Sequence, residues 1–327
     1  MPHDSHIHDA AGGPGRLSPQ DARKITGGAT ALSVGIALIL VTTKLAAWWV
    51  SGSIALLASL ADSALDLAAS LTTFFAVRYA AAPADAEHRY GHGKAEAFAS
   101  FLQSLFIAFS AAWLLYEAGK RIIDPQPVTQ GGWALGVMVL SIVLTTILIW
   151  AQSRAIDKTG SIAVSGDRAH YISDLAANLA VIAGIILAAF FAVTRADPII
   201  AILVAIWLFW SAWGVARGAL DHLLDRELPD EERAKIKALA MEDPKMLDVH
   251  QLRTRAAGPL VHIQFHADLN PDLTLEAAHA ILVDCERRLI AEYPAADILI
   301  HPDPQGRAEP HGSDFFRAEQ DSPEESA

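Results

Sequence analysis

Residues 56–70 read LLASLADSALDLAAS, and residues 169–184 read AHYISDLAANLAVIAG. The two apolar stretches share one pattern: alanine, then an aspartate or a histidine, then three residues, then Asp-Leu-Ala-Ala. The first places Asp62 four residues before Asp66, and the second places His170 four residues before Asp174. Ionisable side chains at membrane depth are costly and usually functional. Three carboxylates and one imidazole suit a tetrahedral divalent cation, so the two motifs predict a metal site inside a membrane.

Apolar residues make up 52% of the 327-residue chain and are concentrated in long runs. Six runs reach, or nearly reach, the roughly 20 apolar residues that cross a bilayer as a helix. They are Ala29–Val50, Ile54–Ala82, Phe98–Ile123, Trp133–Ala151, Ala169–Val193 and Ile199–Leu220. A soluble all-helical protein with buried core helices is disfavoured because six such runs are present. The sequence therefore predicts an α-helical membrane protein with six transmembrane helices.

Basic residues near the ends of these runs predict the orientation of the chain. They gather before the first run, between the second and third, and between the fourth and fifth, whereas the loop after the first run has none. We therefore expect both termini in the cytoplasm, and no signal peptide that is removed. The single cysteine, Cys285, is compatible with a reducing compartment. The net charge of −12 argues against a nucleic-acid partner.

The chain is predicted to have four parts. These are a polar tail (residues 1–24), a six-helix transmembrane domain (25–222), a cytoplasmic domain (223–304) and a disordered acidic tail (305–327). Within the third part, periodicity predicts a helix over 228–241, strands over 247–255 and 260–269, a helix over 273–293 and a strand over 297–301. This αββαβ order predicts a small, ferredoxin-like α+β domain with helices covering one apolar face of its sheet.

The connection between the second and third runs, PADAEHRYGHGKAEAF (residues 83–98), carries Asp85, His88 and His92. Spacings of three and four would bring these side chains onto one cation in a helical turn or a tight loop. From spacing alone, a solvated polar loop that happens to contain two histidines is an equally good interpretation.

The predicted cytoplasmic domain is rich in histidine. Its candidate ligands are His250, His262, His266, His279, His301 and Asp303. On the strand over 260–269, alternation places His262 and His266 on the face opposite the apolar one. Any one of these residues alone would be an ordinary surface histidine, but their density favours a second metal site. The N-terminal tail carries His3, His6 and His8, for which disorder is the simpler interpretation.

A transport mechanism follows from the two membrane motifs. Residues four apart share a helix face, and the two motif-bearing helices run antiparallel, as in an inverted repeat with its binding site near mid-membrane. Protons compete with metal for carboxylate and imidazole ligands, and histidine titrates near pH ~6.5 by default. We therefore expect metal/proton antiport by alternating access. We also expect the helix that bears His170 to begin near Ser161, with its first turns lining a wet cavity.

Three other functions fit the pattern less well. In a polar cluster that merely joins helices, three neighbouring carboxylates would repel one another without a cation. An intramembrane metalloprotease would need an open metal position and usually an HExxH motif, which the sequence lacks. A metal receptor or cation channel remains open, although conduction needs weaker, multi-site binding than a closed tetrahedral set provides.

Taken in order along the chain, these motifs resemble the cation diffusion facilitator family, and in particular its bacterial ferrous-iron and zinc efflux branch. The similarity runs from about Arg23 to Pro304. It includes the two membrane motifs, the loop sequence PADAEHRYGHGKAE, LLDREL (residues 223–228), HQLRTRAAG (250–258) and LIHPDP (299–304). The resemblance implies a homodimer in which the αββαβ domains pack together through bound metal.

The resemblance also implies site residues, all of which are present. The implied transport site is Asp62, Asp66, His170 and Asp174, and the implied loop site is Asp85, His88 and His92. The implied binuclear cytoplasmic site is His250, His266, His279, His301 and Asp303. A charge interlock at the membrane boundary falls on Lys94 and Asp225.

Together these observations predict a homodimeric, multi-pass protein of the bacterial inner membrane that exports a divalent cation, Zn2+ foremost, in exchange for protons. It is not expected to be an enzyme. Fe2+, Cd2+ and Mn2+ are alternative substrates, because affinity order alone does not decide among metals. Zn2+ is also expected in the cytoplasmic domain, with a structural or regulatory role. The expected partners are the lipid bilayer, divalent cations, protons and a second copy of the chain.

Overall fold

The computed structural model describes residues 12–52, 54–123, 132–191 and 196–307. The chain divides into two compact units. The helical unit extends to Leu224 and includes the turn Ala257–Pro259, and the α/β unit holds Asp225–Ala256 and the chain from Leu260 onward. The three histidines of the N-terminal tail, and the acidic tail after residue 307, lie outside the described residues.

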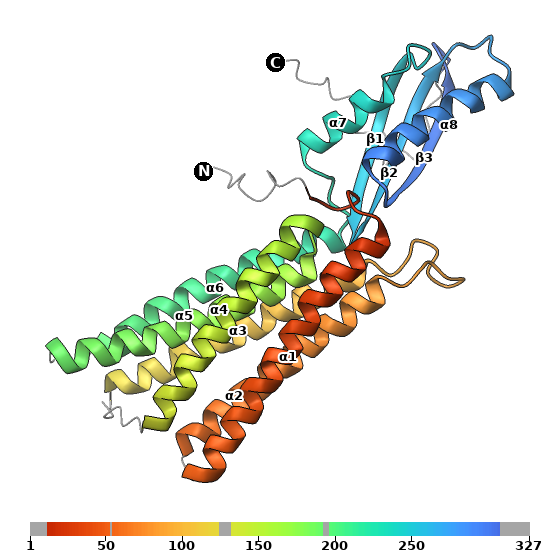
Figure 1. Ribbon diagram of the computed structural model, residues 1–327. Coiled ribbons are helices and arrows are strands. Elements are labelled where there is room, and N and C mark those ends of the chain that lie inside the picture. The colour runs from red at the N-terminus through yellow and green to blue at the C-terminus, as the bar shows by residue number, and fades with distance from the viewer. Residues whose placement is uncertain (1–11, 53, 124–131, 192–195, 308–327) are drawn as a thin grey trace. The chain divides into compact units, whose positions relative to one another are not determined.

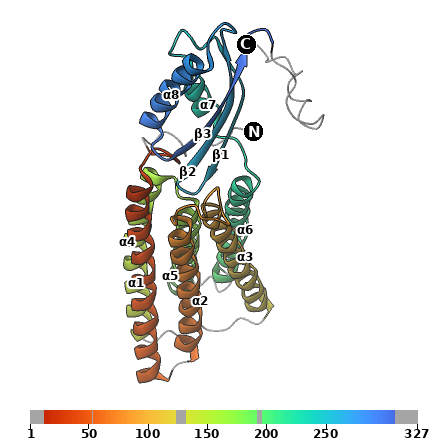
Figure 2. The same cartoon turned by 90° about the vertical axis from the view of Figure 1, so that its right-hand side faces the viewer.

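The helical unit contains six long helices, one for each predicted span (Figures 1 and 2). They are α1 (Pro19–Ser51), α2 (Ile54–Ala80), α3 (Lys94–Ile123), α4 (Gly132–Thr159), α5 (Ile162–Phe191) and α6 (Ala196–Leu223). α5, which bears His170 and Asp174, contacts each of the other five helices. One of the two predicted metal motifs therefore lies on the central helix of the unit.

Within the described part of the chain, five of these helices are long and apolar enough to cross a membrane: α1, α2, α3, α4 and α6. The first half of α5 carries Asp167, Arg168 and Asp174 among its apolar residues.

All the described helices except α2 extend beyond their predicted apolar runs at one end or both. α1 begins at Pro19 rather than near Ala29, and α4 continues to Thr159 rather than ending near Ala151. α1 begins early because the Ser18 side chain accepts a hydrogen bond from the backbone N–H of Asp21, and proline follows at the first helical position. Polar caps of this kind lie outside an apolar run, so hydropathy alone places the start of the helix too late.

α5 begins at Ile162, which confirms the predicted start near Ser161. The carboxylate of Glu96, buried at the start of α3, accepts a hydrogen bond from the hydroxyl of Ser161 and one from the backbone N–H of Ala163. These bonds satisfy donors that a helix start leaves unpaired, and a negative charge is favourable there. Glu96 thereby joins the start of α3 to the start of α5.

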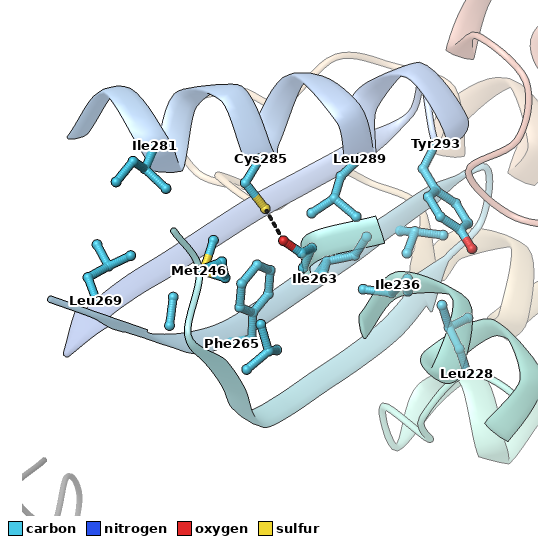
Figure 3. Packing of buried hydrophobic residues seen from close by; sticks show 14 of the residues in the cluster. Leu228, Ile236, Met246, Ile263, Phe265, Leu269, Ile281, Cys285, Leu289 and Tyr293 are labelled. Carbon is cyan, nitrogen blue, oxygen red and sulfur yellow. Dashed lines mark hydrogen bonds between the residues drawn. The ribbon is translucent and has the colours of Figure 1, made fainter. Parts of the chain in front are cut away.

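The α/β unit has the predicted αββαβ order. Its elements are α7 (Asp230–Ala240), β1 (Asp248–Ala257), β2 (Leu260–Leu269), α8 (Leu275–Glu292) and β3 (Ala296–Pro304). The strands lie in the order β1-β2-β3, and β2 is parallel to β3. As alternation on β2 predicts, Ile263 and Phe265 are buried in the core with Cys285 and Leu289 of α8 (Figure 3). His266 and the other even-numbered residues of β2 therefore lie on the opposite face.

Candidate metal centres

Three of the side chains predicted to bind metal meet between α2 and α5. The Nε2 atom of His170 lies 3.2 Å from Oδ1 of Asp66 and 3.7 Å from Oδ2 of Asp174. Ligand atoms of all three residues lie within 4.8 Å of one another. A cation held by oxygen and nitrogen at about 2 Å would fit among them after small side-chain adjustments. The structure thus joins Asp66 of one motif to both candidate ligands of the other.

Asp62, the fourth predicted membrane ligand, is not a member of this group. It lies one helical turn before Asp66 on α2, and its side chain is exposed. A tetrahedral site needs a fourth ligand, which Asp62 or a water molecule could supply. The role of Asp62 in metal binding stays a prediction.

The surroundings of His170 hold its ring in place. The rings of Phe106 on α3 and Tyr171 on α5 lie edge-on to it, with centroids 6.4 and 5.9 Å away. The hydroxyl groups of Tyr171 and Ser70 are 2.7 Å apart and join α5 to α2 beside the group. Because His170 is buried, packing and hydrogen bonding both restrict its orientation.

A buried carboxylate that the sequence reasoning missed lies one turn before the candidate ligand His170. Asp167 accepts hydrogen bonds from the side-chain amides of Gln103 on α3 (3.3 Å) and Gln152 on α4 (2.8 Å). Gln103 also donates to the hydroxyl of Thr73 on α2, at 2.9 Å. One polar cluster therefore joins α2, α3, α4 and α5 around the candidate metal-ligand group of Asp66, His170 and Asp174. Its signal in the sequence is simply an aspartate at membrane depth, which is rarely present without a role.

The loop between α2 and α3 brings Asp85, His88 and His92 together. Nδ1 of His88 lies 3.4 Å from Oδ1 of Asp85, and Nε2 of His92 lies 3.3 Å from Oδ2. No helix forms between Asp85 and His92 in the described loop, so a tight loop brings the three residues together. Backbone N–H groups, that of His88 foremost, donate to Asp85 and lower the pKa of its carboxyl. The charged form that a cation needs is therefore favoured.

A third group lies on the polar face of the sheet, with one residue from each strand. It consists of His250 on β1, His266 on β2 and Asp303 on β3. Nδ1 of His266 lies 2.8 Å from Oδ2 of Asp303, and Nε2 of His250 lies 3.5 Å from the same oxygen. The parallel register places His266 opposite His301, whose Nε2 lies 3.4 Å from Oδ1 of Asp303. The buried Asp303 carboxylate is therefore the shared centre of three histidines.

Two further residues of the α/β unit differ from the prediction. Asp268 was not predicted as a ligand but lies beside this group, and His279 was predicted but is not brought to it. Asp268 lies opposite Asp303 in the register, and its Oδ1 lies 3.3 Å from Nε2 of His250. Its even position on β2 could have identified it, because it shares a face with His266. His279 is exposed on α8, which packs on the other, apolar face of the sheet. Within one copy of the chain, His279 is not part of this group.

Lys94 and Asp225, the predicted interlock, each have a described contact within their own unit. The Nζ atom of Lys94 donates to the backbone carbonyl of Leu223 at 3.1 Å. The Oδ2 atom of Asp225 accepts from Nη1 of Arg255 at 3.1 Å. Asp225 also has a positive φ of 58°, so the backbone turns sharply where the α/β unit begins. The interlock itself stays a prediction.

Three groups of histidine and aspartate, one of them between long apolar helices, define a multi-pass membrane protein that binds metal cations. The cation efflux transmembrane domain matches residues 30–224, and the cytoplasmic domain of cation efflux proteins matches residues 228–305. The chain belongs to the cation diffusion facilitator, or cation efflux, family. It is accordingly a cation efflux transporter and not an enzyme.

Curated relatives of the same family match along most of their length. The cation-efflux pump FieF of Shewanella oneidensis is 44% identical over 276 residues, covering 84% of this chain and 93% of the relative. The cation-efflux pump FieF of Yersinia enterocolitica is 40% identical over 288 residues, covering 88% of this chain and 95% of the relative. The similarity thus extends across both units.

Proposed function

We propose that the transporter exports a divalent metal cation, Zn2+ foremost, in exchange for protons. The observation that carries the proposal is the meeting of Asp66, His170 and Asp174 between α2 and α5. Ionisable groups at membrane depth mark ion pathways, and a site between two helices can be opened to either side when those helices tilt. Asp62 would complete the tetrahedral set while the cation is bound.

The ligand types favour Zn2+ without requiring it. Imidazole and carboxylate ligands in a tetrahedral arrangement suit Zn2+, whereas Mg2+ and Ca2+ prefer six or more oxygen ligands. Fe2+, Cd2+ and Mn2+ remain alternative substrates, because geometry and metal availability select among divalent cations more than affinity does. Both relatives are named as cation-efflux pumps, which supports a cation as the exported substrate.

Proton exchange follows from the shared atoms of the membrane group. The Nε2 atom of His170 faces both carboxylates, so a proton on that atom and a metal bound to it exclude each other. Loading the cation therefore releases protons, and protonation from the opposite side drives the cation off. This competition supports antiport by alternating access rather than passive conduction.

The loop group (Asp85, His88 and His92) and the sheet group (His250, His266 and Asp303) would bind metal on the cytoplasmic side of the bacterial inner membrane. We place both termini on the same side. The sheet group would store or sense Zn2+ and bias the conformation of a homodimer. Such control requires that metal bind the two transport states differently. His279 lies on the far face of the sheet from Asp303, so its part in a binuclear site would depend on the second copy of the chain.

The test is Zn2+ uptake into proteoliposomes under an imposed pH gradient, with wild type beside Asp66→Ala. Uptake that requires the gradient and disappears in the variant would support both the antiport and its site. Gradient-independent, voltage-driven zinc currents would favour a channel. Tight zinc binding without gradient-driven uptake in the wild type would overturn antiport and favour a receptor.

A further inference from the structure

A lysine is buried in the membrane-spanning part of the helical unit. Lys44 of α1 is 8% exposed. Its Nζ atom donates to the backbone carbonyl of Ser59 at 3.2 Å and to the hydroxyl of Ser63 at 2.6 Å, both on α2. Seven residues separate Lys44 from the end of α1, and eight separate Asp62 from the start of α2. At 1.5 Å per residue, both lie about 10–12 Å from the turn between the two helices.

The contacts of this lysine place it beside Asp62, the fourth predicted membrane ligand. Ser63, which holds the ammonium group, directly follows Asp62 in the chain. Lys44 interacts electrostatically with Asp62 on α2 and with Asp174 on α5. A positive charge in a buried, low-dielectric setting is costly unless it is paired, and its field there is weakly screened. The two hydrogen bonds to α2 and the attraction to these carboxylates offset part of that cost.

We propose that Lys44 is a fixed counter-charge of the membrane site, which stabilises the carboxylates while no metal is bound and weakens metal binding enough for release. The inference rests on the proposed transport function. Lys44 does not ligate the metal, because Ser59 and Ser63 hold its ammonium group against α2. It acts through its field, which repels a divalent cation twice as strongly as a monovalent one at the same position. Removing that charge should therefore make the site bind metal more tightly and release it more slowly.

If Lys44 had only a structural role, its replacement would give a different result. If the two hydrogen bonds to α2 were its whole purpose, a neutral donor would keep them and leave metal affinity unchanged. Lys44→Gln supplies such a donor without charge, whereas Lys44→Arg keeps the charge. Ser63→Ala removes the hydroxyl that holds the ammonium group and leaves the charge free to approach Asp62.

The experiment is a Zn2+ titration of the full-length chain in nanodiscs, in a background where His88, His92, His250 and His266 are alanine. Chelator-triggered release is followed in the same samples. We expect Lys44→Gln to bind Zn2+ at least about tenfold more tightly and to release it correspondingly more slowly. We expect Lys44→Arg to stay within about threefold of the background, and Ser63→Ala to bind about threefold or more weakly.

The outcomes separate this inference from the function on which it rests. A folded Lys44→Gln protein with unchanged or weaker zinc affinity overturns the counter-charge while leaving the transport site intact. If Lys44→Gln does not fold, unchanged affinity in Ser63→Ala overturns it instead. Zinc binding that is absent from the background, or that survives Asp66→Ala there, overturns the proposed transport site itself.

Discussion

The Nε2 atom of His170 lies 3.2 Å from Oδ1 of Asp66, although 104 residues separate them in the chain. The candidate ligands of one cation are therefore divided between two helices, so a relative movement of α2 and α5 would change the candidate site directly. A site built within one helix would not respond in this way. The proposed alternating access would use this contact, and the contact leads us to expect a larger role for Asp66 than for Asp62.

Asp66→Asn should abolish zinc binding at the membrane site more completely than Asp62→Asn. Asp66 belongs to the assembled group, and replacing its carboxylate removes a charged ligand that lies beside His170. We expect the loss in affinity to exceed the about 10–100-fold that removal of an outer partner of a metal ligand causes. Zinc titration of the two variants provides the comparison, in a background where the histidines of the loop and sheet groups are replaced by alanine. Equal losses would show that Asp62 is as central as Asp66.

Asp167→Asn should weaken the bundle while leaving metal binding in place. Gln103 and Gln152 donate to different oxygens of Asp167, and an asparagine amide group would oppose one of these donors. We expect the free energy of unfolding to fall by about 1–3 kcal/mol, with less than about a threefold change in zinc affinity at the membrane site. Thermal unfolding in detergent and zinc titration measure the two effects. A large loss of affinity at unchanged stability would instead make Asp167 part of the binding machinery.

Gly166→Ala should disturb the approach of α5 to α3. A Cβ atom at Gly166 would lie 2.8 Å from Oγ and 3.0 Å from Cα of Ser100, so backbone as well as side chain must move. We expect a cost of about 1–3 kcal/mol, as in other overpacked cores. Gly119→Ala on α3 is the matched control, because its Cβ would meet nothing within 4 Å and alanine favours a helix. Thermal unfolding that shifts equally in both variants would contradict the close-approach argument.

Much of the fold is readable from the sequence because its signals are local. Long apolar runs predict the helices, and alternation on β2 predicts which face carries His266. The early start of α1 is not readable from hydropathy, because it depends on a polar cap at Ser18. Helix ends are set by hydrogen bonds that extend beyond the apolar run.

The candidate sites also divide into parts that local sequence signals reveal and parts that depend on contacts between helices. The Asp66–His170–Asp174 group was predictable, because its ligands recur at helical spacing in two matching motifs, whereas spacing alone left the loop group even with a solvated polar loop. The contacts of Asp167 and Lys44 are made with side chains of other helices, so spacing within one helix does not reveal them. Their charge at membrane depth was nevertheless a usable signal.

His262→Gln should remove part of the acid sensitivity of the α/β unit. His262 is buried, and its Nδ1 lies 3.0 Å from Oδ2 of Asp297. Burial foremost lowers the pKa of His262 below its ordinary value, although the hydrogen bond to Asp297 opposes the effect. The unfolded chain therefore binds this proton more readily, so folding stability is lost as pH falls below the ordinary histidine pKa of about 6.5.

The measurement is hydrogen exchange of the β2 and β3 amides in the full-length protein, corrected for intrinsic rates, above and below that pH. Wild type should lose more protection on acidification than His262→Gln, whose amide can still donate to Asp297. An identical loss in both proteins would assign the acid sensitivity to other groups.

Asp303→Asn should impair zinc binding by the sheet group more than His301→Ala does. Asp303 is 3% exposed and lies within 3.5 Å of imidazole nitrogens from His250, His266 and His301, whereas the His301 side chain is 51% exposed. Asp303→Asn removes the negative charge of the one carboxylate that all three histidines contact. His301→Ala removes one ligand, whose position at the metal water can fill. Zinc titration with the membrane and loop groups silenced should show a loss of at least about tenfold for Asp303→Asn and a smaller one for His301→Ala. The reverse order would place the metal nearer the edge of the sheet, at His301. Transport whose dependence on cytoplasmic zinc is unchanged in Asp303→Asn, despite lost binding, would remove the sensing role from this group.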